Sequence, residues 1–192
     1  TDRNFYQLRL EPYLLATSEK HPPLADDFRA EVARLSQNHH CLVHGDYSPK
    51  NILVPKQSLD QKEVMILDAE VAWFGDPVFD VAFILKHFLL KSLYAASTLK
   101  NSPTIFLEMV LAFWQQYDKL LVVNFSYRDQ MEKRITHLIP LLLLARIDGK
   151  STAEYLTYQS QKRIVRQFCY RMIQKKETRI SDLVTIWCQE VG

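Results

Sequence analysis

The sequence predicts a mainly helical α+β fold. Most of its 192 residues show the apolar spacing of amphipathic helices, and two short apolar runs between residues 52 and 67 have the pattern of a β-hairpin. Hydrophobic residues make up 47% of the chain, which is enough to bury a sizeable core. This length and composition favour a single domain over residues 1–192.

Apolar residues at helical spacing define the expected helices in chain order. The first two are separated by the Pro22-Pro23 pair, which interrupts the pattern. The expected helices span residues 5–16, 24–36, 80–96, 104–123, 127–147, 152–175 and 181–190. The hairpin falls between the second and the third of them.

A corner is predicted near Asp148-Gly149. Ser151 and Glu154 form a capping-box pattern there, so one helix is expected to end and the next to begin at residue 152. Arg146 at this corner has two interpretations. It could face a substrate, as could Asp148, or it could compensate the negative end of its own helix.

The predicted hairpin pairs Ile52–Val54 with Val64–Leu67 through a polar loop over residues 55–62. Its second strand leads directly into Asp68. A hairpin of this kind returns Asp68 to the neighbourhood of Asn51, which stands just before the first strand.

Three polar residues around this hairpin have the order that phosphoryl transfer requires. A phosphoryl acceptor needs a carboxylate that orients its hydroxyl and accepts its proton, and Asp46 can supply one. Magnesium takes oxygen ligands and keeps part of its water, so the Asn51 amide and the Asp68 carboxylate could hold it together with phosphates. Each residue alone is common in turns. Their order and spacing together indicate a phosphotransferase site.

The segments His44–Asn51, Asp68-Ala69-Glu70 and Gly75–Asp80 resemble the aminoglycoside phosphotransferase and choline kinase family, the small-molecule relatives of the protein kinases. The resemblance implies the C-terminal lobe of a protein-kinase-like fold, with the hairpin carrying the metal site. It also implies transfer of the γ-phosphate of ATP, with Mg²⁺ as cofactor, to a hydroxyl of a small molecule. Aminoglycosides, choline, methylthioribose, fructosamines and homoserine all suit it.

The same resemblance implies roles for individual residues. Asp46 corresponds to the catalytic base, and Asn51 and Asp68 correspond to the magnesium ligands. Asp80 corresponds to a residue that braces the catalytic loop by bonding its backbone, and at the start of an apolar helix it could also cap that helix. His44 is expected to support the loop as a scaffold residue.

Two positions depart from the protein-kinase pattern. Gly45 stands where protein kinases usually carry an arginine that pairs with a phosphorylated loop, so that form of switching is not expected. Glu70 stands where protein kinases have a glycine. It is interpreted either as a further metal or substrate contact or as an outward-facing carboxylate at a strand end.

The sequence lacks two parts that kinase-like enzymes use to hold a nucleotide. Its four glycines are scattered, so no glycine-rich loop can cover phosphates, and no strand-rich segment with a lysine precedes His44. In such enzymes these parts belong to an N-terminal lobe, which we expect the complete protein to supply. The 192 residues alone are expected to fold but not to catalyse.

Composition disfavours several other classes. The net charge of +2 gives no reason to expect nucleic acid, and the longest apolar stretch, Leu138–Ala145, is too short to cross a membrane. Three cysteines without metal spacing suit a cytoplasmic protein. A non-catalytic kinase-like binding module is the alternative function. A metal-dependent hydrolase is disfavoured, because no second histidine lies at ligand spacing from His44.

Overall fold

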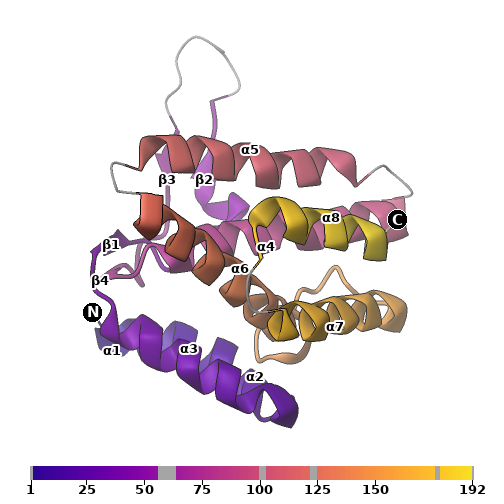
Figure 1. Ribbon diagram of the computed structural model, residues 1–192, viewed down its shortest axis with the longest axis horizontal. Helices are drawn as coiled ribbons and strands as arrows, with labels where there is room; N and C mark the ends of the chain where they lie inside the picture. The colour runs from indigo at the N-terminus through magenta and orange to yellow at the C-terminus, as the bar shows by residue number, and fades with distance from the viewer. Residues whose placement is uncertain (1, 56–63, 100–102, 122–124, 176–177, 192) are drawn as a thin grey trace.

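The computed structural model describes residues 2–55, 64–99, 103–121, 125–175 and 178–191 (Figure 1). Helices dominate it, and the β-structure consists of short strand pairs at one side of the helical body. This arrangement confirms the predicted mainly helical α+β fold.

The N-terminal helical segment is one continuous rod built from α1 (Asp2–Phe5), η1 (Tyr6–Leu15) and α2 (Ala16–Ser18). Its middle part is wound as a π-helix, and the Ala16 N–H accordingly donates to the Glu11 carbonyl five residues back. After a 3₁₀ turn at Pro22–Leu24, α3 (Ala25–Gln37) runs beside this rod (Figure 1). The rod matters for the site because η1 carries Arg9.

Two antiparallel strand pairs follow. The strand β1 (Cys41–Val43) pairs with β4 (Trp73–Gly75), and β2 (Ile52–Leu53) pairs with β3 (Met65–Ile66). In the second pair Ile52 lies opposite Ile66, which confirms the predicted hairpin. Its predicted connecting loop lies outside the described residues beyond Pro55.

The remaining helices form the body of the molecule. They are α4 (Val78–Tyr94) with its continuation η4 (Ala95–Leu99), α5 (Thr104–Leu120), α6 (Phe125–Asp148), α7 (Gln159–Gln174) and α8 (Ile180–Val191). Helix α4 packs against both α5 and α6, α6 packs against α7, and α8 packs against α5 and α7 (Figure 1).

The start of α7 differs from the prediction. The helix begins at Gln159 rather than at residue 152, so the capping box predicted from Ser151 and Glu154 is wrong. Ala153 is buried and its N–H donates to the Arg146 carbonyl at 2.7 Å, which holds this segment in a turn against the end of α6. The N–H group at the actual helix start, that of Tyr158, donates to a glutamine side chain three residues further on.

The start of α4 also differs from the prediction. The helix begins at Val78, and the Val78 N–H donates to the Asp76 carboxylate at 3.1 Å. Asp80 therefore lies within the first turn and does not cap the helix. Its carboxylate is instead free to bond the loop that contains His44.

Lys86 is an unusual feature of α4, because its side chain is fully buried. Its ammonium nitrogen has no hydrogen-bond acceptor among the described residues, and lies 2.9 Å from the ring centre of Phe83 and 5.0 Å from that of Tyr13. Burial places the pKa of Lys86 well below its usual range, with Arg146 nearby adding to the effect. The buried amine should therefore cost stability.

We expect Lys86→Met to raise the stability of the protein at pH 7 by about 2 kcal/mol, because burying a polar group without a hydrogen bond costs that much. The pKa of Lys86 is lower in the folded than in the unfolded chain, so the unfolded chain takes up the proton more readily at pH 7 and the folded state loses further stability. This protonation part of the cost disappears as the pH rises through the pKa of a free lysine. Thermal unfolding at pH 7 and pH 10.5 should show a gain that shrinks at the higher pH. The exposed Lys119→Met is the matched control, and a melting temperature for Lys86→Met below that of the parent would contradict the expectation.

Candidate active site

The loop from His44 to Asn51 is fixed to α4 by Asp80. The backbone N–H groups of His44 and Gly45 donate to the two carboxylate oxygens of Asp80 at 2.7 and 2.9 Å. Burial raises the pKa of Asp80, while these two hydrogen bonds act in the opposite direction. This pair of bonds sets the direction in which the chain enters the loop.

Gly45 is required at the turn of the loop. Its φ of 79° lies in the left-handed region, and an added Cβ would come within 2.8 Å of the Val71 carbonyl oxygen. Any side chain here, including the arginine found in protein kinases, would displace the neighbouring backbone. The Gly45 carbonyl accepts a hydrogen bond from Nε of Arg9 at 2.5 Å.

Asp46 lies at the centre of a small polar network and is only 8% exposed. One of its carboxylate oxygens, Oδ2, accepts a hydrogen bond from the Asn51 amide at 3.2 Å. The same oxygen lies 3.2 Å from the Lys50 ammonium and 3.4 Å from an Arg9 guanidinium nitrogen. Among the described residues no hydrogen bond or ion pair involves Oδ1, so this oxygen can accept a hydrogen bond from a ligand.

Asn51 and Asp68 are brought together by the hairpin. The Leu67 N–H donates to the Asn51 carbonyl at 2.8 Å, which places Asp68 one residue beyond this bond. The Asn51 amide nitrogen donates to Asp46 at both its carbonyl and its carboxylate, so the amide oxygen is left to coordinate a ligand. Asp68 is exposed and has a φ of 65°, a strained conformation for a residue other than glycine.

His44 joins the loop to the strand that precedes Asp68. Its Nδ1 accepts from the Asp46 N–H at 3.1 Å, so Nε2 carries the proton and donates to the Leu67 carbonyl at 2.8 Å. Both ring nitrogens are thereby used to hold backbone. This geometry suits a scaffold residue rather than an acid or base.

The side chains around Asp46 line a cavity of about 470 Å³, which we call the polar pocket. The carboxylates of Asp46 and Asp68 both line it, and so does the exposed side chain of Glu70. The polar pocket is lined by Arg9, Tyr13, Asp46, Lys50, Asp68, Glu70, Phe83, His87, Arg146, Ser151, Thr152, Glu154 and Tyr155.

Several of these residues were not predicted from the sequence. Arg9 lies 36 positions before Gly45, whose carbonyl it contacts, and no local motif marks it. Arg146 was one of two residues suggested at the corner, and it lines the polar pocket. The other, Asp148, is instead paired with His21 and Arg166 and is not among the lining residues.

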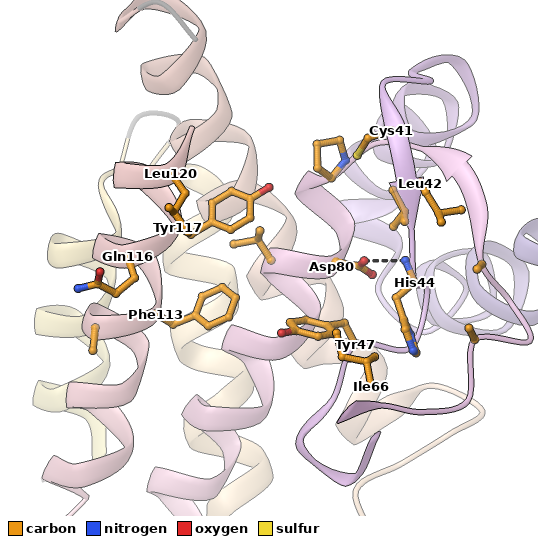
Figure 2. Close-up of a pocket in the computed structure, with 16 residues that line it drawn as sticks. Cys41, Leu42, His44, Tyr47, Ile66, Asp80, Phe113, Gln116, Tyr117 and Leu120 are labelled. Carbon is orange, nitrogen blue, oxygen red and sulfur yellow. Dashed lines mark hydrogen bonds between the residues drawn. The ribbon is translucent and has the colours of Figure 1, made fainter. Parts of the chain in front are cut away.

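A larger and mostly apolar cavity of about 760 Å³ lies between the loop and α5. Figure 2 shows Phe113 and Tyr117 of α5 facing Asp80, His44 and Tyr47 across it. Burial raises the pKa of Tyr117 to about 12, so its hydroxyl stays protonated. The loop separates the two cavities, because His44 lines this one and Asp46 lines the polar pocket.

A braced loop that carries one carboxylate, beside a hairpin that carries a second, defines this molecule as a kinase-like lobe. The comparison with family models agrees, since the model of the phosphotransferase enzyme family matches residues 2–118, more than half of the chain. The chain belongs to that family. A search of curated proteins found no match.

Within the parts of the chain that the structure describes, no helix has both the length and the apolar character to cross a bilayer.

Proposed function

We propose that this protein transfers the γ-phosphate of ATP to a hydroxyl of a small molecule, with Asp46 as the catalytic base and with Asn51 and Asp68 as the protein ligands of Mg²⁺. The observation that carries the proposal is the convergence of these three residues. A hydrogen bond of 3.2 Å joins Asn51 to Asp46, and Asp46 and Asp68 line one pocket. Membership of the phosphotransferase family supports the reaction class.

Each side chain has a physical task in this proposal. Oδ1 of Asp46 accepts the hydrogen bond of the acceptor hydroxyl and takes its proton as the new bond to phosphorus forms. Asn51, Lys50 and Arg9 hold Oδ2 and so fix the direction of the carboxylate.

The oxygen atoms that Asn51 and Asp68 offer are suitable ligands for magnesium. A carboxylate and an amide oxygen are hard ligands, and Mg²⁺ needs only one or two of them together with phosphate and water. When bound, the ion neutralises the charge on the phosphate oxygens during transfer. The exposed Asp68 and the amide oxygen of Asn51 are the ligands that these residues offer.

Nucleotide binding needs more than these residues. A glycine-rich loop and a strand lysine would hold the phosphates from the other side. The four scattered glycines of the sequence form no such loop, and no strand in the described part of the chain contains a lysine. We propose that an N-terminal lobe of the complete protein contributes them. Experiments on turnover should therefore use the full-length protein.

The reaction can be followed directly by ³¹P NMR. The full-length protein is incubated with ATP, Mg²⁺ and a panel that contains an aminoglycoside, choline, methylthioribose, a fructosamine and homoserine. We expect a new phosphomonoester signal with at least one acceptor and its disappearance when EDTA removes the metal. ATP that stays intact with every acceptor, or a rate that EDTA does not change, would contradict the proposed function.

A further inference from the structure

Arg146 differs from the other partly buried arginines of the described chain. Each of the others has a carboxylate within 4.0 Å: Arg9 with Asp46, Arg34 with Glu31, Arg128 with Asp118, Arg134 with Asp76 and Arg166 with Asp148. Among the described residues Arg146 has none. A partly buried guanidinium without an opposite charge is unusual, because desolvating a charge is costly unless it is paired.

Two hydrogen-bond donors at Arg146 and its neighbour Tyr155 have no acceptor among the described residues. Nη1 of Arg146 donates to the Ser151 carbonyl and hydroxyl, both of which are neutral. Its Nε is buried and has no partner among the described residues, and the same holds for the hydroxyl of Tyr155. Burial raises the pKa of Tyr155 to about 12, so this hydroxyl keeps its proton and can donate it.

These free donors belong to the polar pocket. Arg146 and Tyr155 line it together with Asp46. His87, which lines it too, has its pKa lowered to about 2 by burial and by the neighbouring Lys86, so it adds no charge. The pocket is therefore lined both by the reacting carboxylate and by two side chains that carry unpaired donors.

We propose that the acceptor molecule carries an anionic group, a carboxylate or a phosphate, which Arg146 and Tyr155 bind while its hydroxyl lies at Asp46. Such a group has only acceptor oxygens, so it satisfies both free donors, and arginine recognises it with two parallel hydrogen bonds. This inference rests on the proposed function, because it concerns the acceptor of that same site. It makes a purely cationic acceptor, such as an aminoglycoside or choline, a poor match.

The acidic residues of the pocket do not oppose this inference. Asp46 is already balanced by Arg9 and Lys50. Asp68, Glu70 and Glu154 are exposed, and water screens exposed charges strongly. Their effect on a group bound deeper in the pocket is correspondingly small.

The anion could also come from the nucleotide, since a transferring phosphoryl group has the same chemistry. The proposed metal ligands Asn51 and Asp68 lie at the hairpin, whereas Arg146 and Tyr155 come from the end of α6 and the turn that follows it. Because the two pairs lie on different elements, we assign Arg146 to the acceptor. The experiment separates the two sources.

The experiment measures acceptor binding to the full-length protein by ligand-observed NMR. Glycerate and glycerol 3-phosphate are compared with glycerol, gluconate is compared with sorbitol, and choline and kanamycin serve as cationic probes. We expect each anion to bind about tenfold or more tightly than its neutral counterpart, since hydrogen bonds to charged groups contribute that much. Arg146→Gln should abolish this preference and Arg146→Lys should keep part of it. The exposed Arg163→Gln, which removes the same charge elsewhere, should keep all of it.

Several results would overturn the inference. Equal binding of anionic and neutral acceptors to the parent would do so, as would tighter binding of choline or kanamycin. If Arg146→Gln weakens a non-hydrolysable ATP analogue but leaves glycerate unchanged, the residue contacts the nucleotide and the assignment to the acceptor is wrong. Thermal unfolding of each variant checks that the loss of the bonds to Ser151 has not unfolded the site.

Phosphoryl transfer is measured in parallel, so that the two claims can fail separately. Tight anion binding without any transfer from ATP would contradict the proposed function and leave the anion site standing. Transfer to neutral or cationic alcohols without a preference for anions would overturn the inference and leave the function standing.

Discussion

Replacing Asp46 with asparagine should lower turnover of the full-length protein by about 10²- to 10⁴-fold, the usual contribution of a positioned acid–base group. Asparagine has nearly the same size and can still bond Asn51, but it cannot accept a proton from the acceptor. Because Asp46 is not a proposed ligand of the nucleotide or the metal, nucleotide affinity should change little. Steady-state kinetics with a phosphorylated acceptor and calorimetry with a nucleotide analogue measure the two quantities.

A matched control is available in Asp182→Asn, which makes the same change at an exposed position of α8. It should leave turnover unchanged. A turnover of Asp46→Asn within a factor of about two of the parent would remove Asp46 from the role of base.

Removing the metal ligands should raise the magnesium requirement. We expect Asp68→Ala to raise the Mg²⁺ concentration for half-maximal activity about tenfold or more and Asn51→Ala to raise it less, because a carboxylate contributes a full charge and an amide only a dipole. Magnesium titrations of activity that superimpose for the parent and both variants would exclude these residues from the metal site.

The same titration decides between the two interpretations of Glu70. If its carboxylate contacts the metal, Glu70→Gln should shift the titration in the direction of Asp68→Ala. An unchanged magnesium titration with a changed KM for the acceptor would indicate a substrate contact. No change in either quantity would indicate an exposed carboxylate at the strand end.

The hairpin and its polar residues could be predicted because the signals are local in the sequence. Asp46 and Asn51 lie five positions apart in one loop, and the alternation of apolar runs around the turn specifies how Asp68 returns to them. A short segment therefore contained almost all the information about this part of the site.

Arg9 could not be predicted in the same way. It reaches the loop from a helix whose sequence shows only amphipathic spacing, and its contact with Gly45 depends on how that helix packs. The role of Arg146 could not be decided from the sequence either. An arginine that compensates the end of its helix and an arginine that contacts a substrate occupy the same position in the sequence.

The error at the start of α7 has a similar physical cause. Ser151 and Glu154 have the residue types of a capping box, but Ala153 and Leu156 bury their side chains in the hydrophobic core. Tertiary packing and the bond from Ala153 to the Arg146 carbonyl outweigh the local preference for a helix. The non-helical segment between α6 and α7 then supplies Tyr155 to the polar pocket.

The central claim is that Asp46 and Asp68 act on one transition state. The most direct test is the kcat/KM of the double variant Asp46→Asn, Asp68→Ala, compared with those of the two single variants and the parent. Catalytic residues that act as a unit show strongly non-additive losses. We therefore expect the double variant to be about as slow as the slower single variant. Losses that multiply would contradict the claim by showing that the two carboxylates act independently.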